Sequence, residues 1–152
     1  MRTIGSPPST DQRGVARPFN GVPDLGAYEA TLRPDLRIGT KGSPATHRID
    51  GAYNTSGAGQ TIHLKLSGTK TGKAFLSLEN DGDIADDLKL TATRANRTVR
   101  LAAYQITGGE RNVTARLAAG LALDGLAPGG ISLVRIEVKA RSAKRPARQT
   151  IA

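Results

Sequence analysis

Five carboxylates in one short stretch are the side chains best placed to bind a metal ion. They are Glu79, Asp81, Asp83, Asp86 and Asp87. Calcium takes about six to eight oxygen ligands, and a carboxylate-rich turn can supply part of such a set. The spacing departs from the helix–loop–helix calcium pattern, because no Glu stands at its closing position. Asp81, Asp83 and Asp86 are therefore calcium candidates, and a solvated turn is the alternative for the same residues.

The other residue types that could do chemistry lack partners at a useful spacing. His47 and His63 are the only histidines, and neither has a second metal ligand at metal-binding spacing. The Gly-x-Ser-x-Gly pattern of a nucleophilic serine is absent. Tyr28, Tyr53 and Tyr104 could line a sugar-binding surface or pack at strand edges. We therefore expect no catalytic residue, no enzyme activity and no cofactor.

Positive charge is distributed unevenly along the chain, whose net charge is +9. Residues 1–33 carry four basic and three acidic side chains, and residues 34–138 carry thirteen and ten. The last fourteen residues carry five basic side chains and no acidic one. Because the expected folded part is nearly balanced, we expect no specific recognition of nucleic acid. A basic tail is either solvated or a polyanion-binding segment, with these candidate residues: Arg141, Lys144, Arg145 and Arg148.

Length and composition narrow the classes of protein. The 152 residues suffice for one ordinary domain, and the absence of cysteine excludes disulfides and thiolate metal sites. Aromatic residues make up only 3% of the chain, so stacking platforms for bases or sugars are not expected. No run approaches the ~18 apolar residues of a membrane-spanning helix, and the first 20 residues contain no apolar signal-peptide core.

Apolar and polar residues alternate from about residue 34 onward, which is typical of half-buried strands. The clearest case is 60–67, and the pattern returns at 36–38, 74–78, 88–92, 99–106 and 131–138. The turn-forming residues 79–83 between two of these runs predict a hairpin. A phase slip between Leu133 and Val134 predicts a bulge or a strand that changes neighbours.

Residues 112–118 fit two structures. Val113, Ala115 and Leu117 alternate as in a strand, whereas Val113, Leu117 and Leu121 fall at helical spacing. Gly120 and the β-rich surroundings favour the strand. Seven strand candidates with turns between them predict an all-β, seven-stranded antiparallel Ig-like β-sandwich over residues 34–139. Its predicted core is aliphatic and consists of Ile62, Leu64, Leu66, Leu76, Leu78, Leu88, Leu90, Leu101, Leu117, Val134, Ile136 and Val138.

The first 33 residues hold a phrase with fixed spacings: Thr10-Asp11-Gln12-Arg13-Gly14, then Arg17-Pro18, then Asp24-Leu25-Gly26-Ala27-Tyr28-Glu29. This phrase resembles the last rung of the right-handed parallel β-helix of bacterial choice-of-anchor and polymorphic outer-membrane-type surface proteins. The resemblance implies that 1–33 is a remnant of a closing rung, with these residues as ion-pair or hydrogen-bond groups of the closure: Arg13, Asp24 and Glu29. Few residues precede the phrase, so either the chain is a fragment of a longer protein or the helix has been lost.

Residues 34–139 resemble the Ig-like repeats that follow such β-helices. The shared phrases are 34–38, 51–60, 80–82 and 126–130, all strand starts or turns. The resemblance implies a secreted or surface-attached bacterial protein in which these repeats act as spacers or adhesive modules. Residues 140–152 are expected to form a disordered basic tail.

These observations predict a non-catalytic structural or adhesive module, located outside the cell or on its surface. Its partners would be the cell envelope or a polysaccharide. Two alternatives remain open. One is an accessory domain of a β-helix enzyme that degrades polysaccharides and has its active site upstream, and the other is a basic polyanion-binding module.

Overall fold

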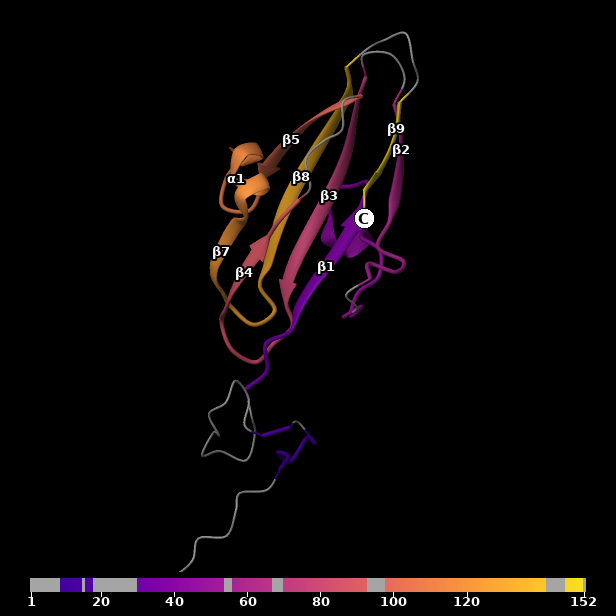
Figure 1. Cartoon of the computed structure of the whole chain (residues 1–152). Coiled ribbons are helices and arrows are strands. Elements are labelled where there is room, and N and C mark those ends of the chain that lie inside the picture. The colour runs from indigo at the N-terminus through magenta and orange to yellow at the C-terminus, as the bar shows by residue number, and fades with distance from the viewer. Residues whose placement is uncertain are drawn as a thin grey trace, which may run out of the picture.

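The computed structural model describes residues 9–14, 16–17, 30–53, 56–66, 70–92, 98–141 and 147–151, with backbone alone for 147–150 (Figure 1). The described chain is all-β with antiparallel sheets, as the alternation predicted. No helix in these ranges is long and apolar enough to cross a membrane. The strands are β1 (Pro34–Gly39), β2 (Ile62–Leu66), β3 (Thr71–Asn80), β4 (Asp86–Leu90), β5 (Val99–Gln105), β6 (Arg111–Asn112), β7 (Leu121–Leu126), β8 (Ile131–Ala140) and β9 (Ala147–Ile151). The helices are a 3-10 turn, η1 (Pro44–Thr46), and α1 (Thr114–Ala119).

The main sheet has five strands in the order β1-β3-β8-β5-β6, and its inner face carries the core. Even-numbered residues of β3 and β8 face inward, so Ala74 lies opposite Ile136, and Leu76 lies opposite Val134. All four side chains are buried. The predicted core is confirmed apart from Leu101, which is only partly buried against it. The core also contains these buried residues that were not predicted: Ile38, Ala74, Val99, Ala103, Val113, Leu121 and Leu123.

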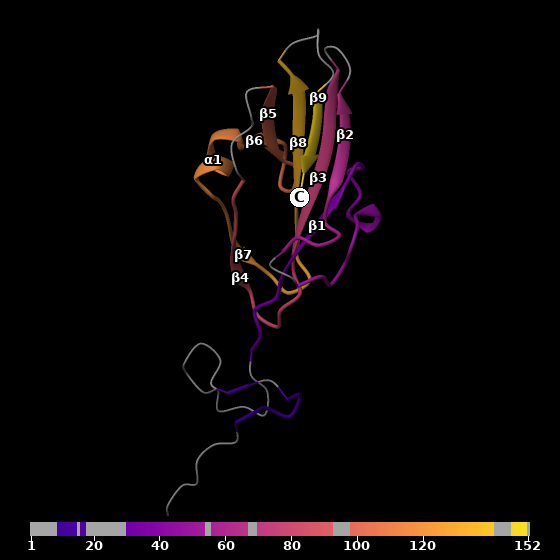
Figure 2. The ribbon, with the colours of Figure 1, turned by 45° about the vertical axis from the view of Figure 1, so that its right-hand side comes forward.

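Two small sheets, β2–β9 and β4–β7, cover the inner face of the main sheet at different places. Figure 2 shows β4, β7 and α1 set apart from the plane of β3, β8 and β5. Strand β2 approaches β3 so closely that a Cβ on Gly72 would lie 2.7 Å from the Leu66 side chain. The described strands therefore number nine rather than seven, and the second layer is split into two pairs.

The hairpin predicted around residues 79–83 is wrong. β3 belongs to the main sheet, whereas β4 pairs with β7 in the other layer, so the chain turns a corner between layers. Asn80, which is fully buried, holds this corner. Its Nδ2 donates to the carbonyls of Ile84 (2.8 Å) and Leu126 (2.7 Å), and its Oδ1 accepts the N–H of Gly82 (2.9 Å). One side chain thereby satisfies three backbone groups, one of them on β7, at the point where the chain leaves the main sheet.

The strand favoured for 112–118 is also wrong beyond its first residue: Asn112 ends β6, but residues 114–119 form α1. Val113 and Leu117 are both buried, and they lie four residues apart on one face of the helical turn. Asn112 Oδ1 accepts the N–H of Thr114 at 3.0 Å at the start of the helix. The segment therefore follows the helical spacing of its apolar residues and not their alternation. The Thr114 hydroxyl accepts the backbone N–H of Ala103 (2.9 Å), which ties the helix to β5.

Two further expectations differ from the structure. β8 pairs with β3 and β5 in an unbroken register, so both the bulge and the change of neighbours predicted at Leu133–Val134 are wrong. Ile131 and Leu133 simply lie half-buried on the outer face. Within the expected tail, residues 147–151 form β9, which pairs with β2 over five residues. The β-branched Thr150 and Ile151 favour this strand despite the nearby basic charge.

We expect Asn80→Ala to lower the free energy of unfolding by about 2–4 kcal/mol, because the carbonyls of Ile84 and Leu126 and the buried N–H of Gly82 lose their partner. Denaturant unfolding measures the effect. Thr91→Ala, an exposed polar truncation near the end of β4, is the control and should change the free energy by no more than about 0.5 kcal/mol. Equal stability of the two variants would show that the corner does not depend on Asn80.

Candidate functional site

The densest group of charged side chains lies on the outer face of the main sheet, around Arg37. Asp35 on β1 stands directly opposite Glu79 on β3, and like charges in that position destabilise a sheet. Arg37 follows on the same face of β1. The loop 40–53 lies beside β1 and brings in Asp50. We call these four residues, Asp35, Arg37, Asp50 and Glu79, the Arg37 cluster.

The guanidinium of Arg37 sits among the three carboxylates. Its Nη1 lies 3.2 Å from Asp50 Oδ2 and its Nε 3.9 Å from Asp35 Oδ2, and its Nη2 donates to Glu79. The Arg37 side chain is 9% exposed and that of Asp35 is fully buried, whereas Asp50 is 73% exposed. Asp35 Oδ2 also accepts the N–H of Gly51 at 3.1 Å, so the cluster fastens the loop to the sheet.

The three carboxylates are the described group that comes closest to a metal site, with oxygens within 4.8 Å of one another. Arg37 already supplies a positive charge to all three, so the structure favours an arginine-centred ion cluster over an open metal site. Burial raises the pKa of Glu79, and Arg37 lowers it in opposition. Asp81, Asp50 and Asp35 raise the pKa of Glu79 further, because their negative charges disfavour another one.

The structure disperses the three calcium candidates. The hydroxyl of Tyr53 donates to Asp81, and Arg33 stacks over the Tyr53 ring with its guanidinium carbon 4.6 Å from the centroid. Asp83 accepts from Arg13 Nη1 at 2.7 Å, and this hydrogen bond lowers the pKa of Asp83. Asp86 lies at the start of β4. Of the five predicted carboxylates, Glu79 alone belongs to the described group with metal-like spacing.

The histidines and tyrosines take structural positions where they are described. His47 Nε2 donates to the carbonyl of Lys41 (2.8 Å), so Nδ1 is left to interact with the Ser77 hydroxyl (2.8 Å). His63 lies on the exposed face of β2. Tyr104 packs under Arg135, whose guanidinium carbon is 4.6 Å from the ring centroid. Tyr28 lies outside the described residues.

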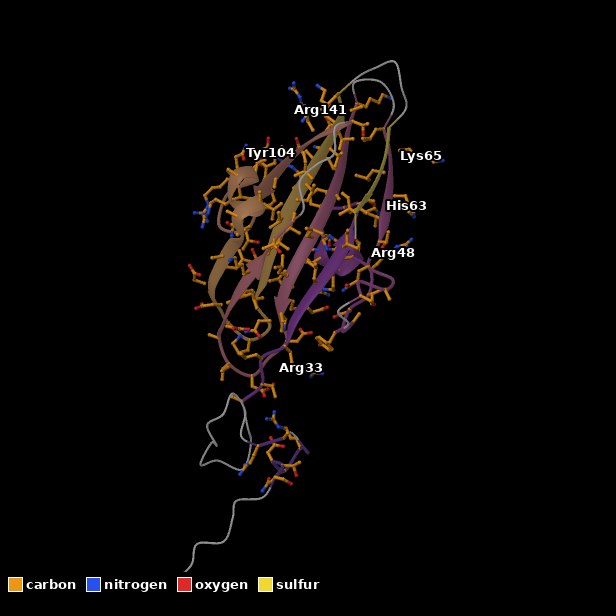
Figure 3. All side chains as sticks on the ribbon, viewed as in Figure 1. Arg33, Arg48, His63, Lys65, Tyr104 and Arg141 are labelled. Carbon is orange, nitrogen blue, oxygen red and sulfur yellow. The ribbon has the colours of Figure 1, made fainter. Side chains whose placement is uncertain are left out.

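The polyanion candidates are only partly described. Arg141 is exposed at the end of β8, where its Nε donates to the carbonyl of Val99 at 3.1 Å. Arg148 pairs with Lys65 in the β2–β9 register. Lys144 and Arg145 lie outside the described residues. Figure 3 shows Arg141 at one end of the molecule and Lys65 on the flank below that end.

A groove of about 460 Å³ lies between β1 and β4. Its walls include Leu36, Leu78 and Leu88, with Asp86 and Asp87 at the side of β4. Asp87 Oδ1 accepts the N–H of Gly125 at 2.6 Å, which ties it to β7. The groove combines an apolar wall with a carboxylate, Asp87, that binds the local backbone.

Compared with known protein families, curated proteins and solved structures, the chain matches none of them.

Sequence reasoning missed Asp35, Arg37 and Asp50 as members of a site. Asp35 and Arg37 stand on the polar side of an alternating strand, where solvent exposure is the ordinary expectation. A signal was present in the Asp-x-Arg spacing, which places opposite charges on one face of a strand.

We expect Arg37→Met to lower the free energy of unfolding at neutral pH by about 3–5 kcal/mol, because buried Asp35 loses its counter-charge. The variant also loses the positive charge that lowers the pKa of Glu79, so this pKa rises further. A carboxyl with a higher pKa in the folded than in the unfolded state binds protons more tightly when folded. The deficit should therefore shrink as the pH falls toward about 4.

Denaturant unfolding across this pH range measures the effect. Lys41→Met removes an exposed cation from the same loop and should cost no more than about 0.5 kcal/mol. A deficit that stays constant with pH would rule out uncompensated carboxylates as its cause.

The hydrogen bond to Asp81 raises the pKa of Tyr53 to about 12. In Asp81→Asn we expect this pKa to move toward the ordinary value of about 10. Because the unfolded chain loses the proton first, the stability contributed by this contact is lost as the pH rises from about 10 to 12. Ultraviolet absorbance titration follows the phenolate, and Tyr53→Phe identifies its component. An unchanged titration in Asp81→Asn would contradict the assignment.

Proposed function

We propose that this chain is a non-catalytic structural and adhesive module, with an immunoglobulin-like β-sandwich, from a secreted or cell-surface bacterial protein. The observation that carries the proposal is a bridge between the segment resembling a β-helix closing rung and the end of the sandwich. That bridge runs through Arg13. This contact supports a module in which the β-sandwich is joined to the N-terminal segment by an ion pair as well as by the chain itself.

The bridge begins in a compact turn. Asp11 has a fully buried side chain and accepts the backbone N–H of Arg13 at 2.8 Å, and also accepts from its Nε and Nη2 at 3.2 and 3.1 Å. Arg13 Nη1 then reaches Asp83 Oδ2, which also accepts the hydroxyl of Thr31 at 2.8 Å. These ion pairs of Arg13 with Asp11 and Asp83 support the structural role that the resemblance implied for Arg13. Asp24 and Glu29 lie outside the described residues.

The rival function is that of an accessory domain attached to a β-helix enzyme whose active groove lies upstream. Glycoside hydrolysis uses two carboxylates placed on either side of a sugar, with one of them free to give up a proton. In the described chain, the closest carboxylates share the guanidinium of Arg37 instead. This arrangement favours a structural use of the acids that the chain itself carries.

The proposal predicts that the purified full chain is retained on polysaccharide-coated surfaces and releases no new reducing ends from the polymers. Surface plasmon resonance measures retention, and a reducing-sugar assay measures cleavage. The polymers should include acidic and neutral ones, so that a preference is visible. Cleavage of any polymer by this chain would overturn the non-catalytic function, whereas absence of retention on all of them would leave a structural spacer without adhesion.

A further inference from the structure

Charge in the folded part is segregated along its long axis. The register sets the position of each residue, because β8 runs from Ile131 at one end to Ala140 at the other. Val99 of β5 lies opposite Ala140, and Thr71 of β3 lies opposite Lys139. Exposed cations gather at this end, and we call them the basic end: Lys65, Lys70, Arg100, Lys139 and Arg141.

Two cross-strand pairs in this region join like charges. Arg100 stands directly opposite Lys139 on the outer face, and Lys65 stands opposite Arg148 in the other layer. Such pairs destabilise a sheet. In the described chain, no carboxylate forms a salt bridge with Lys65, Arg100 or Lys139. Like charges therefore face each other here without a counter-charge among the described residues, whereas Arg37 forms ion pairs with the carboxylates of Asp35 and Glu79 on β1 and β3.

Carboxylates gather toward the opposite end of the axis. The turn after β3 carries Asp81 and Asp83, and β4 begins with Asp86 and Asp87. Glu137 is the described carboxylate nearest the basic end in the β8 register, and it is held by Arg135 Nε at 2.9 Å. The basic end therefore projects a positive potential that nearby acids do not cancel.

We propose that the basic end is the adhesive surface of the module and that its ligand is an acidic polysaccharide. This proposal rests on the proposed function. A polyanion fits because Arg100 and Lys139 stand on adjacent strands about 4.8 Å apart, close to the length of one sugar unit along a polymer, and Lys65 and Arg148 form a second such pair in the other layer. The described aromatic side chains, Tyr53, Phe75 and Tyr104, stand on other parts of the fold. The basic end thus offers charge without an aromatic platform, so its ligand is held by charge, whereas single-stranded nucleic acid is also held by base stacking.

The test measures binding of the full chain to immobilised polygalacturonate and heparin, with dextran as the neutral control and duplex DNA as a competing polyanion. The double variant Arg100→Glu with Lys139→Glu should bind the acidic polysaccharides at least about tenfold more weakly and show a smaller salt dependence. The matched control is Lys41→Glu with Arg111→Glu, which changes two exposed cations away from this end by the same net charge. It should bind nearly as well as the wild type.

The single variant Lys139→Glu separates binding from folding. It converts the Arg100–Lys139 repulsion into an opposite-charge pair, so its melting temperature should rise while its affinity falls. A role in folding alone would lower the melting temperature instead. A variant with Lys144→Ala and Arg145→Ala measures the contribution of the tail.

Each outcome is informative. Undiminished binding in the Arg100–Lys139 variant, or loss of binding only when Lys144 and Arg145 are changed, overturns the basic end as the site. Tighter binding to DNA than to both polysaccharides overturns the ligand class. If the wild type binds neither polysaccharide, this inference and the adhesive half of the proposed function both fail, whereas cleavage of a polysaccharide defeats the proposed function alone.

Discussion

The pairing of β3 with β8 is the constraint on which the rest of the molecule depends. Both strands have ten residues, and nine positions of each are in register. β1 adds to the free edge of β3 and β5 to that of β8, so these two strands determine the position of every other strand in the main sheet. Their inner faces bury aliphatic side chains under the two small sheets, which is the main source of stability for such a domain. Their outer faces and ends then determine where the charged groups meet.

Local pattern predicted the strands well and their partners poorly. Ile62, Leu64 and Leu66 alternate with polar residues, and such a period needs no knowledge of distant chain. Whether β3 and β4 pair is a different question, because residues 79–83 suit a hairpin and a corner equally. The corner prevailed because Asn80 is buried against Leu126, a residue 46 positions away. The Arg37 cluster was missed for the same reason. Arg37 is buried because the loop 40–53 lies beside β1, and the alternation within β1 contains no information about that loop.

The net charge of a segment is a poor guide to the electric potential at its folded surface. Residues 34–138 are nearly balanced, which suggested a folded part without a strong field. Antiparallel pairing brings Arg100 beside Lys139 and leaves Asp81 to Asp87 at the other end. Acids are therefore neutralised where Arg37 and Arg13 reach them, whereas Arg100 and Lys139 have no acid partner among the described residues. A segment can have a net charge near zero and still carry its positive and negative charges at opposite ends. Only this separation bears on binding.

The β2–β9 pair has a consequence for the order in which the protein is made. Leu66 and Ala147 are register partners although 81 positions separate them. A ribosome therefore releases β2 long before its partner exists, and the early chain carries an open strand edge with apolar Leu64 beside it. The β2–β9 pair cannot form before residue 151 has been synthesised, so this half of the second layer closes after β3, β8 and β5 are already available to pair.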